Sequence, residues 1–144
     1  MKLQVLAAIL FAPLLAVGSF DDEAIKKEMK QLEGTWTILS LEVNGNPVSE
    51  DDAKKFKLLT MGDKWTLSVD GKTTESTYQV DCAKDPKTID WIDAKGQATH
   101  GIYSLVDDTL QMCRRLEPNK PRPTEFAAPA DSGTLLVVWK RAKP

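Results

Sequence analysis

The chain is poor in the residues that most often carry catalysis or bind metals. Its 144 residues include one histidine, His100, and two cysteines, Cys82 and Cys113. Without a Cys-x-x-Cys pair or a second histidine, the sequence has no zinc-ligand pattern. His100 also has no serine, cysteine or aspartate at the spacing of a catalytic motif. The sequence therefore predicts a protein that is not an enzyme and that needs no metal or cofactor.

The chain also lacks an excess of positive charge. It carries 19 basic and 21 acidic side chains, for a net charge of −2 at pH 7. Nucleic acids and anionic membranes attract proteins through basic patches, so neither is a predicted partner. The charged residues are scattered along the sequence, as is typical of a solvated surface.

A long apolar segment is missing as well. The run from Leu3 to Ala16 is shorter than the roughly twenty residues that span a bilayer. It follows Lys2 and ends in small residues, which is typical of a signal peptide cleaved before Ser19. The sequence predicts a signal peptide over 1–18 and one domain over 19–144. That domain would be exported to the periplasm, the cell envelope or the medium, with no membrane span after cleavage.

Exported proteins enter an oxidising environment, where a disulfide between Cys82 and Cys113 is chemically allowed. Each cysteine lies at the end of a strand-like run, and those two strands would not be neighbours in a sheet that follows chain order. A disulfide needs Cα atoms within about 7 Å of each other. The sequence therefore leaves two possible states for these cysteines, a disulfide-bonded pair and two free thiols.

The mature chain begins with a short helix and continues as strands. Apolar residues at Ile25, Met29 and Leu32 form one stripe after the acidic start at Asp21, and Gly34 ends the helix. Alternation with a period of two then predicts eight strands. They lie at about 35–43, 56–61, Trp65–Val69, 73–82, Ile89–Ile92, 98–106, Leu110–Cys113 and Thr134–Arg141.

Short connections between these strands predict an antiparallel meander. Eight strands can close on themselves, so we expect an all-β, up-and-down antiparallel barrel with a short N-terminal helix. A two-sheet sandwich of the same strands is the alternative. In the first strand the apolar parity changes between Ile38 and Leu39, which predicts a bulge or sharp bend there.

The large aromatic residues on these strands have two interpretations. They either fill the barrel as its core or line a pocket for a flat or apolar ligand. The residues are Trp36, Trp65, Tyr78, Trp91, Tyr103 and Trp139.

Five motifs in this order resemble an uncharacterised lipocalin-like domain family of planctomycete bacteria. That resemblance covers about 30–141 and implies a lipocalin-like barrel, frequent export and no established activity. The motifs are Glu33-Gly34-Thr35-Trp36, Pro86-Lys87-Thr88-Ile89-Asp90, Gly101-Ile102-Tyr103-Ser104-Leu105, Asp108-Thr109-Leu110-Gln111-Met112-Cys113 and Lys120-Pro121-Arg122-Pro123-Thr124-Glu125-Phe126.

A weaker resemblance to true lipocalins rests on Gly34-x-Trp36 and a late arginine. In lipocalins such a tryptophan seals one end of the barrel and an arginine packs across its ring. The resemblance implies that Gly34, Trp36 and Arg141 close the barrel here, with Arg114 or Arg115 as less favoured arginines. A guanidinium on an indole face contributes about 0.5–2 kcal/mol.

The long segment 116–133, here called the 116–133 loop, is the predicted carrier of any protein contact. Its four prolines stiffen it, so Arg122, Glu125 and Phe126 could form a rigid recognition surface. The alternative is a strap that packs Phe126 over an open barrel end while Arg122 pairs with Glu125.

The sequence thus predicts a monomeric, non-enzymatic binding protein. One hypothesis is a carrier or sensor of a small apolar or amphipathic ligand held inside the barrel. The other is a filled barrel that binds a cell-envelope protein through the 116–133 loop.

Overall fold

The computed structural model describes residues 12–143, with side chains from Asp22 onward. Most of the predicted signal peptide, residues 1–18, lies outside this range, so its cleavage and the export of the chain stay predictions. None of the helices in the described range is long and apolar enough to cross a membrane.

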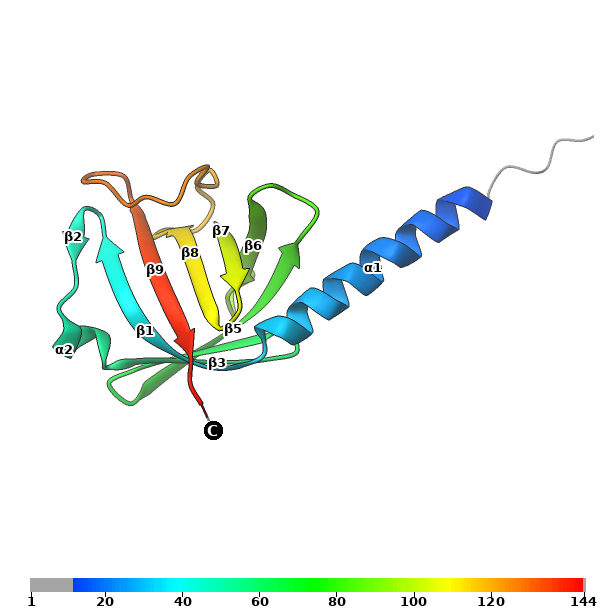
Figure 1. Ribbon diagram of the computed structural model, residues 1–144. Helices are drawn as coiled ribbons and strands as arrows, with labels where there is room; N and C mark the ends of the chain where they lie inside the picture. The colour runs from blue at the N-terminus through cyan, green and yellow to red at the C-terminus, as the bar shows by residue number, and fades with distance from the viewer. Residues whose placement is uncertain (1–11, 144) are drawn as a thin grey trace, which may run out of the picture.

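The main strands form one antiparallel sheet that closes into a barrel (Figure 1). Each strand pairs with its neighbour in the barrel, and β1 pairs with β9 to complete the circle. The predicted eight-stranded up-and-down barrel is confirmed, and the two-sheet sandwich is wrong. The elements are α1 (Ala12–Leu32), β1 (Gly34–Val43), β2 (Asn46–Pro47), α2 (Glu50–Ala53), β3 (Phe56–Met61), β4 (Lys64–Val69), β5 (Lys72–Asp81), β6 (Lys87–Ile92), β7 (Ala98–Val106), β8 (Thr109–Arg115) and β9 (Thr134–Arg141).

The predicted irregularity in the first strand is a β-bulge. The register of β1 against β9 shifts between Ile38 and Ser40. The extra residue, Leu39, is 56% exposed, whereas Leu41 is again buried. A bulge bends a strand and increases its twist, so this one helps β1 to pair with β3 over its first residues and with β9 over most of its length.

A tight turn after β1 adds the two-residue strand β2, which the sequence did not predict as a strand. Asn44 and Gly45 both have positive φ, 52° and 88°, as a type I′ hairpin requires. A side chain on Gly45 would come within 2.7 Å of the backbone of Ala130. Gly45 therefore lets this turn lie directly against the 116–133 loop, which connects β8 to β9 and is called the β8–β9 loop from here on.

The predicted N-terminal helix is confirmed, and the described part of it, α1, also includes residues before Asp21. Its described residues run without interruption from Ala12 to Leu32. Alanine and leucine, which are strong helix formers, occur at Ala12 and Leu14–Ala16, and the helix extends back into the predicted signal peptide. Cleavage before Ser19 would fall inside it. Figure 1 shows that only the C-terminal part of α1 lies against the barrel.

A buried carboxylate attaches α1 to the barrel. Glu28 accepts hydrogen bonds from the Tyr103 hydroxyl at 2.9 Å and from Lys87 Nζ at 2.8 Å. Burial, with Glu28 beside it, raises the pKa of Tyr103, so the tyrosine stays protonated as a donor. Leu32, one turn further along, is fully buried in the core.

Trp36 lies at this end of the barrel and is also fully buried. Its indole nitrogen donates to the carbonyl oxygen of Leu32 at 3.1 Å and lies 3.4 Å from the hydroxyl of Thr60. The Thr60 hydroxyl donates to the same carbonyl. The end of α1, β1 and β3 are thereby joined around one indole ring.

Arg141 of β9 covers the outer side of that ring, with its guanidinium carbon 4.3 Å from the ring centroid. The guanidinium also donates to the carbonyl oxygens of Gln31 and Glu33 and to Asp108. A Cβ on Gly34 would come within 2.8 Å of this group. The structure therefore brings Gly34, Trp36 and Arg141 together where α1 meets the barrel, and the arginine also satisfies carbonyls at the helix end.

Candidate functional site

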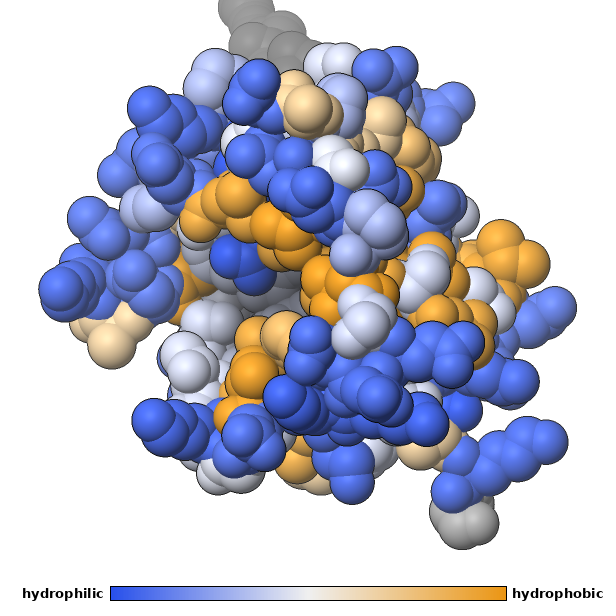
Figure 2. Space-filling model, turned by 90° about the vertical axis from the view of Figure 1, so that its left-hand side faces the viewer, coloured by the Kyte–Doolittle hydropathy of each residue, from blue (hydrophilic) through white to orange (hydrophobic). Residues whose placement is uncertain are grey.

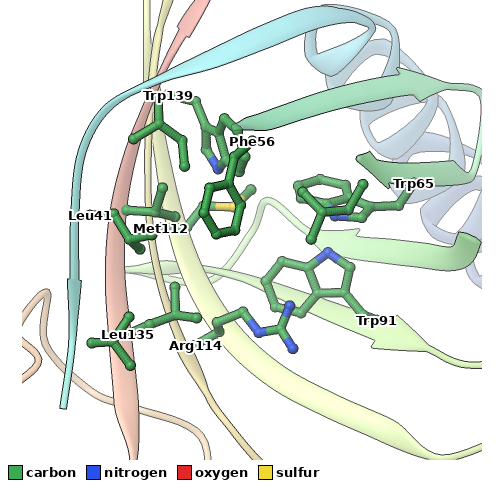
Figure 3. A pocket seen from close by; sticks show the side chains of 12 residues that line it. Leu41, Phe56, Trp65, Trp91, Met112, Arg114, Leu135 and Trp139 are labelled. Carbon is green, nitrogen blue, oxygen red and sulfur yellow. The ribbon is translucent and has the colours of Figure 1, made fainter. Parts of the chain in front are cut away.

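The interior of the barrel contains a cavity of about 140 Å³. It opens on the face shown in Figure 2, which is hollowed between apolar side chains. Inward-facing residues of β1, β3, β4, β6, β8 and β9 line it (Figure 3). They are Ile38, Leu41, Val43, Phe56, Trp65, Leu67, Trp91, Met112, Arg114, Leu135, Val137 and Trp139.

The six aromatic residues singled out from the sequence divide between the two predicted roles. All six are buried. Trp36, Tyr78 and Tyr103 are absent from the cavity lining and serve as core. The other three, Trp65, Trp91 and Trp139, line the cavity.

Two of the cavity tryptophans are fixed by edge-to-face contacts. The ring of Trp65 lies 5.3 Å from that of Tyr78 and 5.4 Å from that of Trp91, at interplanar angles of 67° and 75°. This is a favoured geometry for aromatic pairs. One wall of the cavity is therefore a set of mutually supported rings, and Figure 3 shows it facing Leu41, Met112 and Leu135.

Arg114 is the one charged residue in the cavity lining. Its guanidinium lies over the ring of Trp91, 4.9 Å from the centroid. Burial lowers the pKa of Arg114 from its ordinary value, but an arginine keeps its proton in proteins. A positive charge is thus held at the wall of an otherwise apolar space.

A glycine on the intervening strand makes this arrangement fit. Gly101 of β7 faces inward between Trp91 and Arg114. A Cβ there would come within 2.9 Å of the Trp91 ring, 3.1 Å of the Arg114 Cβ and 2.7 Å of the Cys113 carbonyl oxygen. The absence of a side chain lets Arg114 cross the strand to reach the indole.

The β8–β9 loop packs on the outer wall of the barrel. Arg122 forms an ion pair with Asp90 at 2.9 Å and donates to the carbonyl oxygens of Ile89 and Gly101. The alternative in which Arg122 pairs with Glu125 does not hold, because the guanidinium is bound by residues of β6 and β7. Glu125 is exposed and Phe126 is half-buried.

Apolar residues beneath the loop form a second, smaller buried patch. Ile102 and Cys113 point outward from β7 and β8 yet are almost fully buried, as is Ala128 of the loop. The loop thus covers part of the barrel wall. Arg122, one of the three residues predicted to form a recognition surface, instead attaches the loop to the barrel.

Cys82 and Cys113 are free thiols in the structure, so of the two states left open by the sequence it shows the unbonded one. The Cys113 thiol donates to the carbonyl oxygen of Ala127, and burial raises its pKa. Cys82 is half-buried just after β5. Cys113 therefore serves as a packing residue under the loop.

His100 also lies on the outer wall. Its Nδ1 is 2.6 Å from Oδ1 of Asp90, the same oxygen that Arg122 binds at 2.9 Å. His100 therefore contacts the same aspartate to which Arg122 attaches the β8–β9 loop. Within the described residues, no group of three or more histidine, cysteine, aspartate or glutamate side chains is arranged to hold a metal ion.

Sequence reasoning gave Arg114 only as a less favoured closure arginine and missed its place in the cavity. A signal was present: Arg114 shares the parity of Leu110 and Met112, which point inward from β8. Alternation alone would have placed its side chain on the inner face.

The chain was also compared with known proteins. No family model, no curated protein and no solved structure matches it. The closed antiparallel barrel is consistent with a lipocalin-like fold, and the resemblance to the planctomycete family stays a prediction from the motifs.

Proposed function

We propose that this protein binds one small, mainly apolar ligand in the barrel cavity and acts as a carrier or sensor of it. The observation that carries the proposal is the cavity of about 140 Å³ lined almost entirely by apolar side chains. An apolar cavity of about 150 Å³ is known to bind benzene or xenon. The apolar part of the ligand is therefore about the size of a single benzene ring.

The alternative, a filled barrel that binds an envelope protein through its loop, has less support. A filled barrel would leave no interior space, whereas this one contains the cavity. Arg122, one of the two charged residues expected to contact a partner, is bound to Asp90 and to two backbone carbonyls of the barrel.

Tryptophan fluorescence tests the ligand proposal directly, since three of the four tryptophans line the cavity. Titration with benzene-sized compounds should give a saturable change at about one ligand per chain. Val137→Phe adds bulk to the cavity lining and should weaken binding about tenfold or more. The matched control, Val138→Phe, changes the next residue of β9, which faces away from the cavity, and should bind as the parent does. A panel without any saturable response, or equal effects of the two variants, would contradict the proposal.

The proposal includes export and a non-enzymatic role. Mass spectrometry of the protein from cells should find Ser19 as the first residue of the mature chain. An uncleaved chain would contradict export and leave the cavity proposal intact. A hydrolytic activity abolished by His100→Ala would contradict the non-enzymatic role.

A further inference from the structure

The polar side-chain groups that line the cavity are all hydrogen-bond donors. Its lining residues are aliphatic or aromatic apart from Met112 and Arg114, and none has a carboxylate, amide or hydroxyl group. A guanidinium and an indole N–H donate hydrogen bonds and accept none. The cavity therefore offers donors and a positive charge to whatever it holds.

Arg114 has no acidic partner in the part of the chain that the structure describes. Its Nε donates to the backbone carbonyl of Arg115 at 3.2 Å, and its plane stacks on Trp91. By contrast, Arg122 and Arg141 are each paired with an aspartate, at 2.9 Å in both cases. The terminal nitrogens of Arg114 are thus the charged donors of the cavity that remain available to a ligand.

Two indole nitrogens in the same lining also lack an acceptor. Trp91 and Trp139 are 4% and 5% exposed, and neither Nε1 has a hydrogen-bond partner among the described residues. A buried N–H without a partner is costly and uncommon in folded proteins. Figure 3 shows the Trp139 nitrogen facing the space between Met112 and Phe56. An acceptor brought by the ligand would relieve this cost.

We infer that the ligand is a small organic monoanion, a carboxylic acid whose apolar body is about one benzene ring in size. Its carboxylate binds the guanidinium of Arg114, and its apolar body lies between the aromatic wall and the aliphatic side chains of β1 and β9. This inference rests on the proposed function, because it names the chemical class of the ligand in the same cavity.

Charge complementarity is the basis of the preference. A carboxylate accepts two hydrogen bonds in the geometry that a guanidinium offers. A neutral ligand of the same shape would leave the positive charge unpaired in an apolar wall, and a cationic one would be repelled. The preferred order is therefore acid, then alcohol, then amine.

Three probes that share one skeleton test this order. Phenylacetate, 2-phenylethanol and 2-phenylethylamine differ in the charge of the head group and carry the same ring. Each is titrated against the full chain by calorimetry and by tryptophan fluorescence. We expect phenylacetate to bind about tenfold or more tightly than 2-phenylethanol, and the amine to bind most weakly.

Variants of Arg114 assign the preference to that residue. Arg114→Met keeps length and apolar bulk, and should remove the preference for the acid while leaving 2-phenylethanol within about twofold. Arg114→Lys keeps the charge and should retain part of the preference. Lys140→Met, the control, removes one positive charge from the exposed side of β9 and should change nothing. Near-ultraviolet circular dichroism verifies that each variant keeps its packed core.

The outcomes separate this inference from the proposed function. If acid and alcohol bind equally well and Arg114→Met changes neither, the anion inference is overturned and the cavity proposal stands. Tighter binding of the amine would also overturn the inference. If none of the three probes nor benzene itself binds, the proposed function falls, and the inference falls with it.

Discussion

Replacing Trp36 by alanine should destabilise the barrel more than replacing most other single residues. The ring is fully buried, its nitrogen donates to the Leu32 carbonyl, and Arg141 stacks on its face. The substitution would leave an empty space where α1, β1, β3 and β9 meet, and would also remove the surface on which the guanidinium rests.

The size of the effect follows from these contacts. Truncation of a buried tryptophan or phenylalanine to alanine costs about 3–5 kcal/mol. Loss of the stacking with Arg141 contributes about 0.5–2 kcal/mol of that effect, whereas the Leu32 carbonyl keeps its bond from Thr60. We therefore expect a loss of about 3–5 kcal/mol, a large part of the 5–15 kcal/mol that stabilises a typical domain. Trp36→Phe keeps an aromatic face and most of the volume, so it should cost about 1–2 kcal/mol.

Urea denaturation followed by far-ultraviolet circular dichroism measures these differences without relying on the altered fluorescence. Thr37→Ala is a matched control, because Thr37 is the next residue of β1 and is exposed. It should change stability by less than about 0.5 kcal/mol. If Trp36→Ala lost less than about 1 kcal/mol, or no more than the control, Trp36 would not be the seal of this barrel end.

Three further substitutions test other parts of the structure. The Tyr78 hydroxyl is buried without a partner in the described chain, so Tyr78→Phe should keep or raise stability at pH 7 by up to about 1 kcal/mol, and a larger loss would refute this. Burial raises the pKa of Tyr78 to about 12 from 10.0, so this tyrosine ionises at lower pH in the unfolded chain than in the folded one. The free energy of unfolding should therefore fall as the pH rises from about 10 to about 12, and it should fall less in Tyr78→Phe. Gly101→Ala should displace Trp91, cost about 1–3 kcal/mol and shift tryptophan emission, and an unchanged spectrum would speak against the close packing there. Asp90→Asn removes the charge that binds Arg122, so limited proteolysis should cut the β8–β9 loop faster than in Asp81→Asn, and equal rates would contradict the anchoring role.

Most of the barrel could be predicted because local signals agree with the fold. Strands β3 and β9 have the predicted bounds, since their alternation is regular and turn residues flank them. The parity change at Leu39 located the bulge. The two-residue β2 was missed because so short a strand has no periodicity, and its pairing depends only on the turn at Asn44 and Gly45.

The candidate site was less predictable because it depends on contacts between distant strands. Alternation shows that Trp91 and Trp139 face inward, but a cavity is the space left after all inward side chains are packed. The environment of Arg114 depends on Gly101 and Trp91, which belong to two other strands. The binding of Arg122 to Asp90 likewise joins residues 32 positions apart, and no local periodicity indicates that they meet.

The junction of α1, β1 and β9 sets the order in which the chain can complete its fold. Arg141 donates to carbonyls 108 and 110 positions earlier in the chain, and β9 supplies the pairing that closes β1. A chain emerging from the ribosome therefore keeps two unpaired strand edges, on β1 and β8, until its last strand has been made. Such edges invite pairing with other chains, and contacts this distant in sequence form slowly. Closure of the barrel therefore requires β9 for two pairings at once, β1 with β9 and β8 with β9.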